Sequence, residues 1–330
     1  MDYGEILGIR KLITTAEAQR FPELMLQDRV PEEGIEGDLA EWDIEYVNKV
    51  LQNNFVSRDA KAKPSQFEKL GHKTANCLHS FFFNHVPAGK LRLLRQPGTE
   101  RERNARAWIT RLQRDMRRRH GALVDEWMLW EALKGSLTAA YEGVNVAIDY
   151  EIPTTHKPTA SASWATTTTD IFADIETWSQ LIVEDSGRMP TTMFFNSSVL
   201  PYLYKNDLVK SYLASTNVGT QIVQDGRVSR LFGLNLVQWD AAYVNGSGTT
   251  TKFIPDNMVL IVPDFSEDWI QMLRGEVVIP TEDGEDFQYV REGWYTEVTR
   301  NPVGMHLYYK TCRIPALKVP AAVVYADVIP

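Results

Sequence analysis

The sequence contains little cysteine and no long apolar run. Cys77 and Cys312 are its two cysteines among 330 residues, too few for a disulfide framework and compatible with a reducing compartment. No apolar stretch approaches the roughly 20 residues of a membrane-spanning helix. The N-terminus lacks the basic and apolar regions of a leader peptide. We therefore expect a chain that is neither secreted nor inserted into a membrane.

Motifs for catalysis and cofactor binding are lacking as well. The sequence has no phosphate-binding glycine loop, no dinucleotide-binding glycine fingerprint, no H-E-x-x-H zinc motif and no calcium loop. Its carboxylates show no paired catalytic spacing. We therefore assign no catalytic residues, no cofactors and no metal ligands. A soluble α/β enzyme, with a site assembled only in three dimensions, stays open as the less favoured alternative.

Four side chains that can bind zinc lie within fourteen residues: His72, Cys77, His79 and His85. Cys77 and His79 would share one side of a strand, because side chains two residues apart point to the same face. Structural zinc sites usually contain paired short spacings such as C-x2-C, and this segment has none. We therefore predict ordinary loop and strand histidines here.

The charge is distributed unevenly along the chain. The net charge of −8 does not fit a simple nucleic-acid-binding protein. Residues 1–60 carry a net charge of −7, residues 61–134 of +9 and residues 135–330 of −10. Such blocks can neutralise one another within one chain or across contacts between identical copies. The sequence leaves both possibilities open.

The strongest local pattern predicts one long amphipathic helix over residues 99–134. Thr99 is placed to cap the helix, with Glu102 three residues later as in a capping box, and Lys134-Gly135 is typical of a helix end. Three- and four-residue spacings, with one gap, define an apolar face: Ala105, Trp108, Leu112, Met116, Leu123, Trp127 and Trp130. Such a helix spans on the order of 50 Å, with Gly121 as the candidate point of bending.

The same helix carries a basic stripe that includes Arg111, Arg114 and Arg118. These side chains could contact the phosphates of a nucleic acid. Alternatively they form a solvated or ion-paired face, because Glu102 and Asp115 lie among them. The residues by themselves favour the second interpretation.

Before this helix, residues 1–40 predict an extended arm with one short helix near Thr15, and Trp42–Val47 alternates like a half-buried strand. A polar excursion follows, which contains Arg58, Lys61, Lys63 and Lys69. Together with the strand-like Leu78–Phe83 it predicts a hairpin-like loop over about 55–85. We expect this loop to make few contacts with its own domain, because it has little core of its own.

After the helix, residues 137–150 predict a β-hairpin and residues 170–262 a mixed α/β unit. Within that unit we expect a helix capped by Asp170, a buried strand at 192–195, a second helix capped by Ser197 or Ser198, and a buried strand at 258–262. Residues 269–330 predict mainly strands.

This order of elements resembles the major capsid proteins of tailed bacteriophages with the Hong-Kong-97-type fold, in the branch of the lambda phage E protein. Four short collinear matches carry the resemblance: Trp130–Thr138, Val144–Tyr150, Phe253–Asn257 and Arg291–Tyr295. The resemblance implies an α+β capsid fold with an N-terminal arm (1–41), a strand and extended loop (42–96), a peripheral domain (97–164 and 263–310) with the spine helix 99–134, and an axial α/β domain (165–262 and 311–330).

The function implied by the resemblance is self-assembly, without enzymatic activity, into the icosahedral shell around the double-stranded DNA of a tailed phage. The protein would be assembled in the host cytoplasm and found in the virion capsid. The implied partners are further copies in hexamers and pentamers, a decoration or cement protein, a scaffold, a portal and non-specifically bound DNA, but no membrane. Loop residues Arg58, Lys61, Lys63 and Lys69 would contact neighbouring copies. An encapsulin-like nanocompartment is the related alternative.

Overall fold

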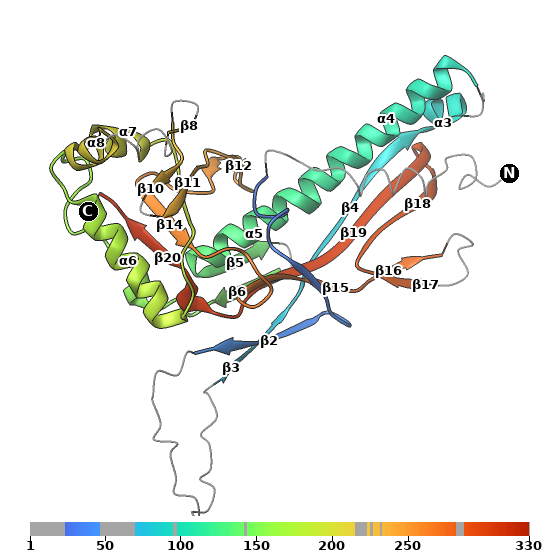
Figure 1. Ribbon diagram of the computed structural model, residues 1–330. Helices are drawn as coiled ribbons and strands as arrows, with labels where there is room; N and C mark the ends of the chain where they lie inside the picture. Colours follow the sequence, from blue (N-terminus) through green and yellow to red (C-terminus); the bar gives the residue numbers. More distant parts are fainter. Residues whose placement is uncertain are drawn as a thin grey trace, which may run out of the picture. The chain divides into compact units, whose positions relative to one another are not determined.

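The computed structural model describes residues 24–46, 70–94, 98–141, 144–214, 223–224, 227–231, 233–281 and 287–329. The chain divides into two compact units (Figure 1). The first, here the spine unit, lies within Met1–Ala40, Thr74–Leu129 and Gln271–Ala316. The second, here the α/β unit, lies within Glu41–Lys73, Trp130–Ile270 and Leu317–Pro330. The predicted helix near Thr15 lies outside the described residues.

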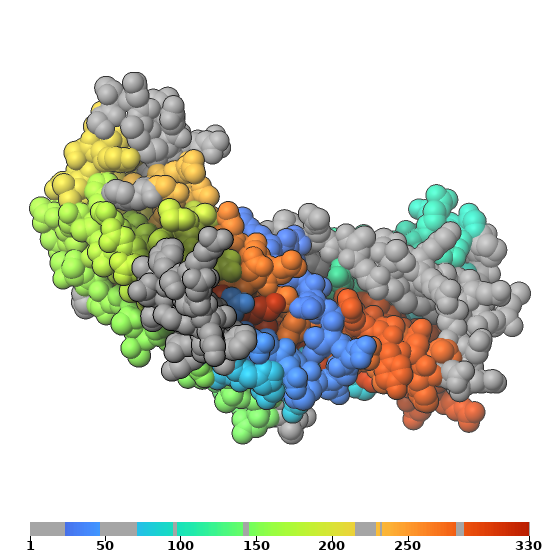
Figure 2. Space-filling model, turned by 60° about the horizontal axis from the view of Figure 1, so that its bottom comes forward, coloured from blue at the N-terminus to red at the C-terminus, as the bar shows by residue number. Residues whose placement is uncertain are grey.

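The spine unit is built on a five-stranded sheet with the order β1-β15-β19-β18, in which β4 also pairs with β19. Its strands are β1 (Glu32–Gly34), β4 (Leu78–Pro87), β15 (Ile270–Gly275), β18 (Glu292–Arg300) and β19 (Val303–Leu317). Strand β1, in the blue part of the chain in Figure 2, pairs in parallel with β15, which belongs to the orange part. A separate hairpin joins β16 (Val277–Pro280) and β17 (Phe287–Val290).

Strand β4 corrects the predicted loop. It pairs antiparallel with β19 from Leu78, opposite Arg313, to Pro87, opposite Gly304. Residues 78–85 therefore belong to the main sheet of their own unit and are not an arm of the loop. The second strand of the hairpin is β3 (Leu70–Asn76), which pairs with β2 (Leu39–Glu45). The polar sequence of β3 gave it no clear alternating pattern.

The predicted long helix is confirmed as three consecutive segments, α4 (Glu100–Arg117), a π-helical turn η1 (Arg118–Ala122) and α5 (Leu123–Lys134). The predicted cap is present, because Thr99 Oγ1 accepts a hydrogen bond from the Glu102 backbone N–H at 3.1 Å. Glu102 Oε2 in turn accepts from the Gly98 N–H at 2.7 Å. A short helix, α3 (Ala88–Leu94), comes before it.

The buried face of the helix differs in part from the predicted one. Met116 and Trp130 are buried, but Trp108 is only partly so, and Ile109 takes its place in the core. The predicted stripe has its gap at η1. A π-helical turn adds a residue, which rotates the following positions by about 100°. Gly121 lies in this turn, and a Cβ there would lie 2.5 Å from the Tyr309 hydroxyl.

The α/β unit contains a second five-stranded sheet, of order β10-β11-β7-β14-β20. Its strands are β7 (Thr192–Phe195), β10 (Arg230–Leu231), β11 (Leu234–Gln238), β14 (Met258–Val262) and β20 (Val324–Asp327). Helix α6 (Ile171–Ser186) begins where predicted, because Asp170 Oδ1 accepts from the Ala173 N–H at 3.0 Å. Trp178 of this helix packs in one core with Met193 and Phe195 of β7.

The prediction of a serine cap on the next helix is wrong. Helix α7 (Leu200–Lys205) begins after Val199 without a side-chain cap. Ser198 Oγ is used elsewhere, because it donates to Asn196 Oδ1 at 2.5 Å and accepts from the Asn257 N–H at 2.9 Å. Helix α8 (Asp207–Ala214) is instead capped by Asn206, whose Oδ1 accepts from two backbone N–H groups.

Short hairpins and turns complete the α/β unit. They are β5 (Ser136–Tyr141) with β6 (Val144–Asp149), β8 (Val223–Gln224) with β9 (Arg227–Val228), β12 (Ala242–Val244) with β13 (Thr250–Lys252), and the 3-10 turns η2 (Thr154–His156) and η3 (Pro320–Ala322). The first of these hairpins was predicted from its alternating pattern. Among the helices in the described part of the chain, none is both long and apolar enough to cross a bilayer.

Candidate assembly surfaces

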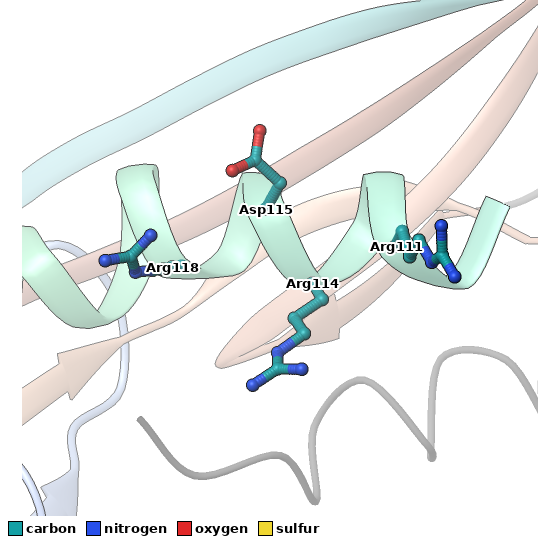
Figure 3. Close-up of a pocket in the computed structure, with 4 residues that line it drawn as sticks. All are labelled: Arg111, Arg114, Asp115 and Arg118. Carbon is teal, nitrogen blue, oxygen red and sulfur yellow. The ribbon is translucent and has the colours of Figure 1, made fainter. Parts of the chain in front are cut away.

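The basic face of the spine helix consists of Arg111 and Arg114 of α4 and Arg118 of η1, which the structure places along one open hollow together with Asp115 (Figure 3). All three arginines are exposed. Arg114 points away from Asp115 in this view, and Asp115 is paired with Arg119 at 3.1 Å. The basic face is therefore a strip of positive charge at the surface.

Other arginines of the helix are ion-paired within the spine unit. Arg106 Nε lies 2.8 Å from Glu102 Oε1, and Arg117 Nε lies 3.0 Å from Glu292 Oε1. The hydrogen bond from Arg106, followed by that from the Gly98 N–H, lowers the pKa of Glu102. Arg106 and Arg117 of the arginine stripe thus help to hold the unit together.

The predicted loop residues Arg58, Lys61, Lys63 and Lys69 lie outside the described residues, but the base of their hairpin is defined. Lys73 Nζ of β3 lies 2.5 Å from Glu151 Oε1, and the Tyr46 hydroxyl donates to Glu151 Oε2 at 2.9 Å. These bonds, that of Lys73 first, lower the pKa of Glu151. Glu151 therefore bonds both to Lys73 of β3 and to Tyr46, the residue that follows β2.

The segment after residue 23 is fixed to the spine helix by a buried carboxylate. Glu126 is fully buried, and its Oε2 accepts from the Leu26 N–H at 2.8 Å and from the Gln27 N–H at 3.2 Å. Further along, Arg274 of β15 donates to Glu32 of β1 at 2.6 Å. The end of the predicted arm is therefore an integral part of the spine unit.

A buried charge network lies where the spine helix meets the sheet. Asp125 of α5 lies 2.5 Å from Arg313 Nε and 2.9 Å from Arg274 Nη2. Arg313 is fully buried, and it also bonds to Ser80 Oγ and to the His120 carbonyl. Sequence reasoning missed this network because its members are far apart in the chain. The one local signal was Asp125 among the apolar residues of the helix.

The outward face of the spine sheet is aromatic and exposed. We define this aromatic face by Phe81 and Phe83 of β4, His306 and Tyr308 of β19, and Tyr295 of β18. The rings of Tyr308, Tyr295 and Phe81 lie against one another, with centroids 4.6 Å apart for Tyr308 and Tyr295 and 5.6 Å apart for Tyr308 and Phe81. The ring of Phe83 lies 4.4 Å from that of His306. Phe81 and Phe83 are 51% and 53% exposed. Contiguous exposed aromatic groups mark interaction surfaces.

The residues on the opposite face of this sheet show why the sequence pattern did not predict the aromatic face. Met305, Leu307 and Tyr309 of β19 face the spine helix and are buried. Between them, His306 and Tyr308 point outward, because neighbouring side chains of a strand alternate. The sequence pattern predicts the alternation, but an aromatic outer face looks like core until the helix is placed.

The four side chains that were considered as zinc ligands, and predicted to be ordinary loop and strand residues, do not form one group. His72 Nδ1 lies 3.0 Å from Asp43 Oδ1, and His85 packs edge-on against His306. His79 lies instead beside Asp38 and Cys312. In the described parts of the chain, these last three are the only group of His, Cys, Asp and Glu side chains close enough to share an ion.

The fold and these surfaces define a structural protein that associates with further copies of itself. A family profile identifies it more closely, because the profile of the family described as phage major capsid protein E matches residues 12–326. The chain belongs to this family. It is a major capsid protein that forms the icosahedral shell of a tailed phage, a component of the virion capsid and not an enzyme.

Solved structures agree with this assignment in their fold. A phage-related protein from Bordetella bronchiseptica RB50 is 16% identical, with a TM-score of 0.59 over 97% of this chain and 96% of that chain. A proposed capsid protein of a prophage of Escherichia coli CFT073 is 15% identical, with a TM-score of 0.54 over 95% and 87%. The SrpI encapsulin of Synechococcus elongatus PCC 7942 is 9% identical, with a TM-score of 0.52 over 94% and 88%. No curated protein matches the chain.

Proposed function

We propose that the chain builds its shell from hexamers and pentamers in which the aromatic face is covered by a neighbouring copy. The observation that supports this is the exposed stack of Phe81, Tyr308 and Tyr295 on an otherwise well-packed sheet. A capsid protein meets copies of itself on several sides, and burial of aromatic rings is a main source of interface stability. A second copy is therefore the occupant that we assign to this face.

The edges of the aromatic face suit a protein partner. Lys310 Nζ lies 5.0 Å above the Phe81 ring and bonds to the Val278 carbonyl. At another edge, Tyr308 donates to Glu297 Oε2 at 2.9 Å. An apolar centre with charges of both signs around it is the usual arrangement of a protein interface. DNA would meet a carboxylate here, which disfavours it.

The remaining parts of the chain take the roles that the resemblance implies. Residues 1–41 serve as the arm, 42–96 as strand and extended loop apart from β4, which belongs to the main sheet, 97–164 with 263–310 as the peripheral domain, and 165–262 with 311–330 as the axial domain. The segment with Arg58, Lys61, Lys63 and Lys69 reaches a neighbouring copy. A scaffold, a portal and a decoration or cement protein complete the partners of the shell.

The basic face has two candidate partners, packaged DNA and acidic groups of a neighbouring copy. The acidic blocks of the sequence favour the neighbour as the stronger contact, since the chain has a net charge of −8. Contact with DNA would be non-specific and sensitive to salt. We propose that the basic face serves both, with the larger share in contacts between copies.

The aromatic face is tested by replacing Phe81, Phe83 and Tyr308 together by serine. We expect a folded subunit whose critical concentration for assembly rises at least about tenfold, because each lost aromatic contact is typically worth 1 kcal/mol or more at an interface. Sedimentation and electron microscopy measure the shells. Phe287→Ser is the matched control, since Phe287 is 73% exposed on β17. Shells of the triple variant at wild-type yield would contradict the proposal.

The basic face is tested by replacing Arg111, Arg114 and Arg118 together by glutamine. We expect a reduced yield of shells and a smaller loss of retained DNA, with both effects strongest at low salt. Arg101→Gln with Arg103→Gln serves as the control, because both side chains are exposed near the start of α4. A variant that assembles at wild-type yield and loses only DNA would show that DNA is the main partner.

A further inference from the structure

A mixed cluster of metal-binding atoms lies in the spine unit, at one end of the aromatic face. His79 Nε2 lies 3.4 Å from Asp38 Oδ2 and 3.5 Å from Cys312 Sγ, and all three ligand atoms lie within 4.8 Å of one another. A carboxylate, an imidazole and a sulfur thus converge from three separate segments of the chain.

The spacing of these atoms fits a tetrahedral zinc ion. With bonds of about 2.3 Å to sulfur and about 2.05 Å to nitrogen or oxygen, neighbouring ligands lie about 3.6 Å apart for S and N and about 3.3 Å apart for N and O. The observed distances, 3.5 Å from Cys312 Sγ to His79 Nε2 and 3.4 Å from His79 Nε2 to Asp38 Oδ2, match these two values. The carboxylate–imidazole distance of 3.4 Å is longer than that between His72 Nδ1 and Asp43 Oδ1, which is 3.0 Å.

The backbone holds the three residues in place. The register of the main sheet sets His79 directly opposite Cys312, and the Cys77 N–H donates to the Asp38 carbonyl at 2.8 Å. Gly275 keeps the space beside the sulfur open, because a Cβ there would lie 3.1 Å from Cys312 Sγ. Ligands fixed in this way lose little entropy when an ion binds.

We propose that Asp38 Oδ2, His79 Nε2 and Cys312 Sγ bind one zinc ion. Binding breaks the S–H bond of Cys312, releases its proton to water and forms the zinc–sulfur bond. The ion enters from solvent, because the side chains of His79 and Asp38 are 48% and 62% exposed, and a water molecule takes the fourth position. The ion ties residue 38 to strands β4 and β19.

The spacing rule used on the sequence could not detect this site. Cys312 is 233 residues away from His79, and the search for short paired spacings excluded Cys77 and His79 as ligands. Of the four residues considered in the sequence, His79 is a proposed ligand and Cys77 is a neighbour of Cys312. Cys77 is buried, and its thiol is hydrogen-bonded to Cys312.

The second cysteine provides a sharp test, because oxidation to a Cys77–Cys312 disulfide would remove the sulfur ligand. Cys77→Ser prevents that oxidation and leaves all three proposed ligands. The full-length protein is stripped with chelator, reduced, and titrated with Zn²⁺ alone by calorimetry and with Co²⁺ alone by visible absorption. We expect one ion per chain, a thiolate-cobalt spectrum, and a higher melting temperature with zinc.

The variants separate the proposed ligands from their surroundings. Cys312→Ser and His79→Ala should weaken zinc binding at least about tenfold, with the fold checked by circular dichroism. Cys77→Ser should bind as the wild type does, and His72→Ala is the matched control, because His72 also faces a carboxylate. The proposal is overturned if Cys312→Ser binds zinc as tightly as the wild type, or if Cys77→Ser loses the ion as fully as Cys312→Ser.

Discussion

The two five-stranded sheets differ in how much of their surface their own unit covers. In the α/β unit, all four residues of β7 are buried. Met193 and Phe195 pack with Trp178 of α6, and Phe194 packs against Trp130. In the spine unit, the helix covers Met305 and Tyr309 on one face. The other face of that sheet is the aromatic face, which no element of its own unit covers in the described part of the chain.

This difference separates what a subunit needs to fold from what it needs to assemble. A sheet covered on both faces is stable without neighbours. A sheet with an exposed aromatic face gains further stability when another copy binds, as is usual for proteins whose folded state is linked to assembly. The spine unit is therefore where we expect mutation to separate folding from assembly.

The largest loss of stability is expected in the sheet of the α/β unit, which is covered on both faces. Phe194→Ala removes a fully buried ring and should lower the free energy of unfolding of the unassembled subunit by about 3–5 kcal/mol. Denaturant unfolding of the subunit measures this loss. The triple variant of the aromatic face is the comparison, and it should lose only about 1–2 kcal/mol, because each exposed cross-strand aromatic pair contributes about 0.2–1 kcal/mol. Equal losses in both variants would remove the distinction between the sheets.

A variant of the buried charge network tests whether these ion pairs hold the spine helix on its sheet. Asp125→Ala leaves the buried Arg313 without its carboxylate partner and should cost about 3–5 kcal/mol in unfolding free energy. Asp115→Ala is the matched control on the same helix. Its exposed pair with Arg119 should contribute only about 0–1 kcal/mol. A negligible loss in Asp125→Ala would show that the network does not hold helix and sheet together.

The smallest expected effect is at the base of the β2–β3 hairpin. The pKa of Glu151 is lowered from its ordinary value of 4.5 by Lys73 and Tyr46, so the bonds stabilise the fold above that pH. The stabilisation is lost as the pH falls through the lowered pKa. Because the pair is partly exposed, solvent screening limits it to about 1 kcal/mol or less.

Hydrogen exchange of the β3 amides measures this effect. Lys73→Ala should increase exchange slightly at neutral pH, and the difference from the wild type should vanish in acid. Lys210→Ala is the control, since it removes an ion pair, with Asp207, that lies within α8 and does not involve the hairpin. A difference that persists in acid would mean that the lysine stem, and not its charge, stabilises the hairpin.

Local patterns predicted the elements with strong periodicity. The spine helix with its Thr99 cap, α6 with its Asp170 cap and the buried strand β7 are confirmed. Each of them is specified by side chains within a few residues of one another. The family was also predicted correctly. The four short matches to the capsid family are weak one by one, but they occur in the same order along the chain as in the family.

Contacts between distant residues could not be predicted. The charged groups of Asp125 and Arg313 come together only after α5 packs on β19, and no spacing in the sequence encodes that approach. Gly121 allows Tyr309 to approach the spine helix closely, and no spacing in the sequence encodes that approach either. Strand β4 was assigned to the loop because its aromatic outer residues hide the alternation that pairs it with β19.

A cryo-electron microscopy map of the assembled shell tests the central claim most directly. We predict hexamers and pentamers in which a neighbouring copy covers Phe81, Phe83 and Tyr308, while Phe194 has the same surroundings as in the single subunit. Shells in which that aromatic face is open to solvent in every copy would contradict the account.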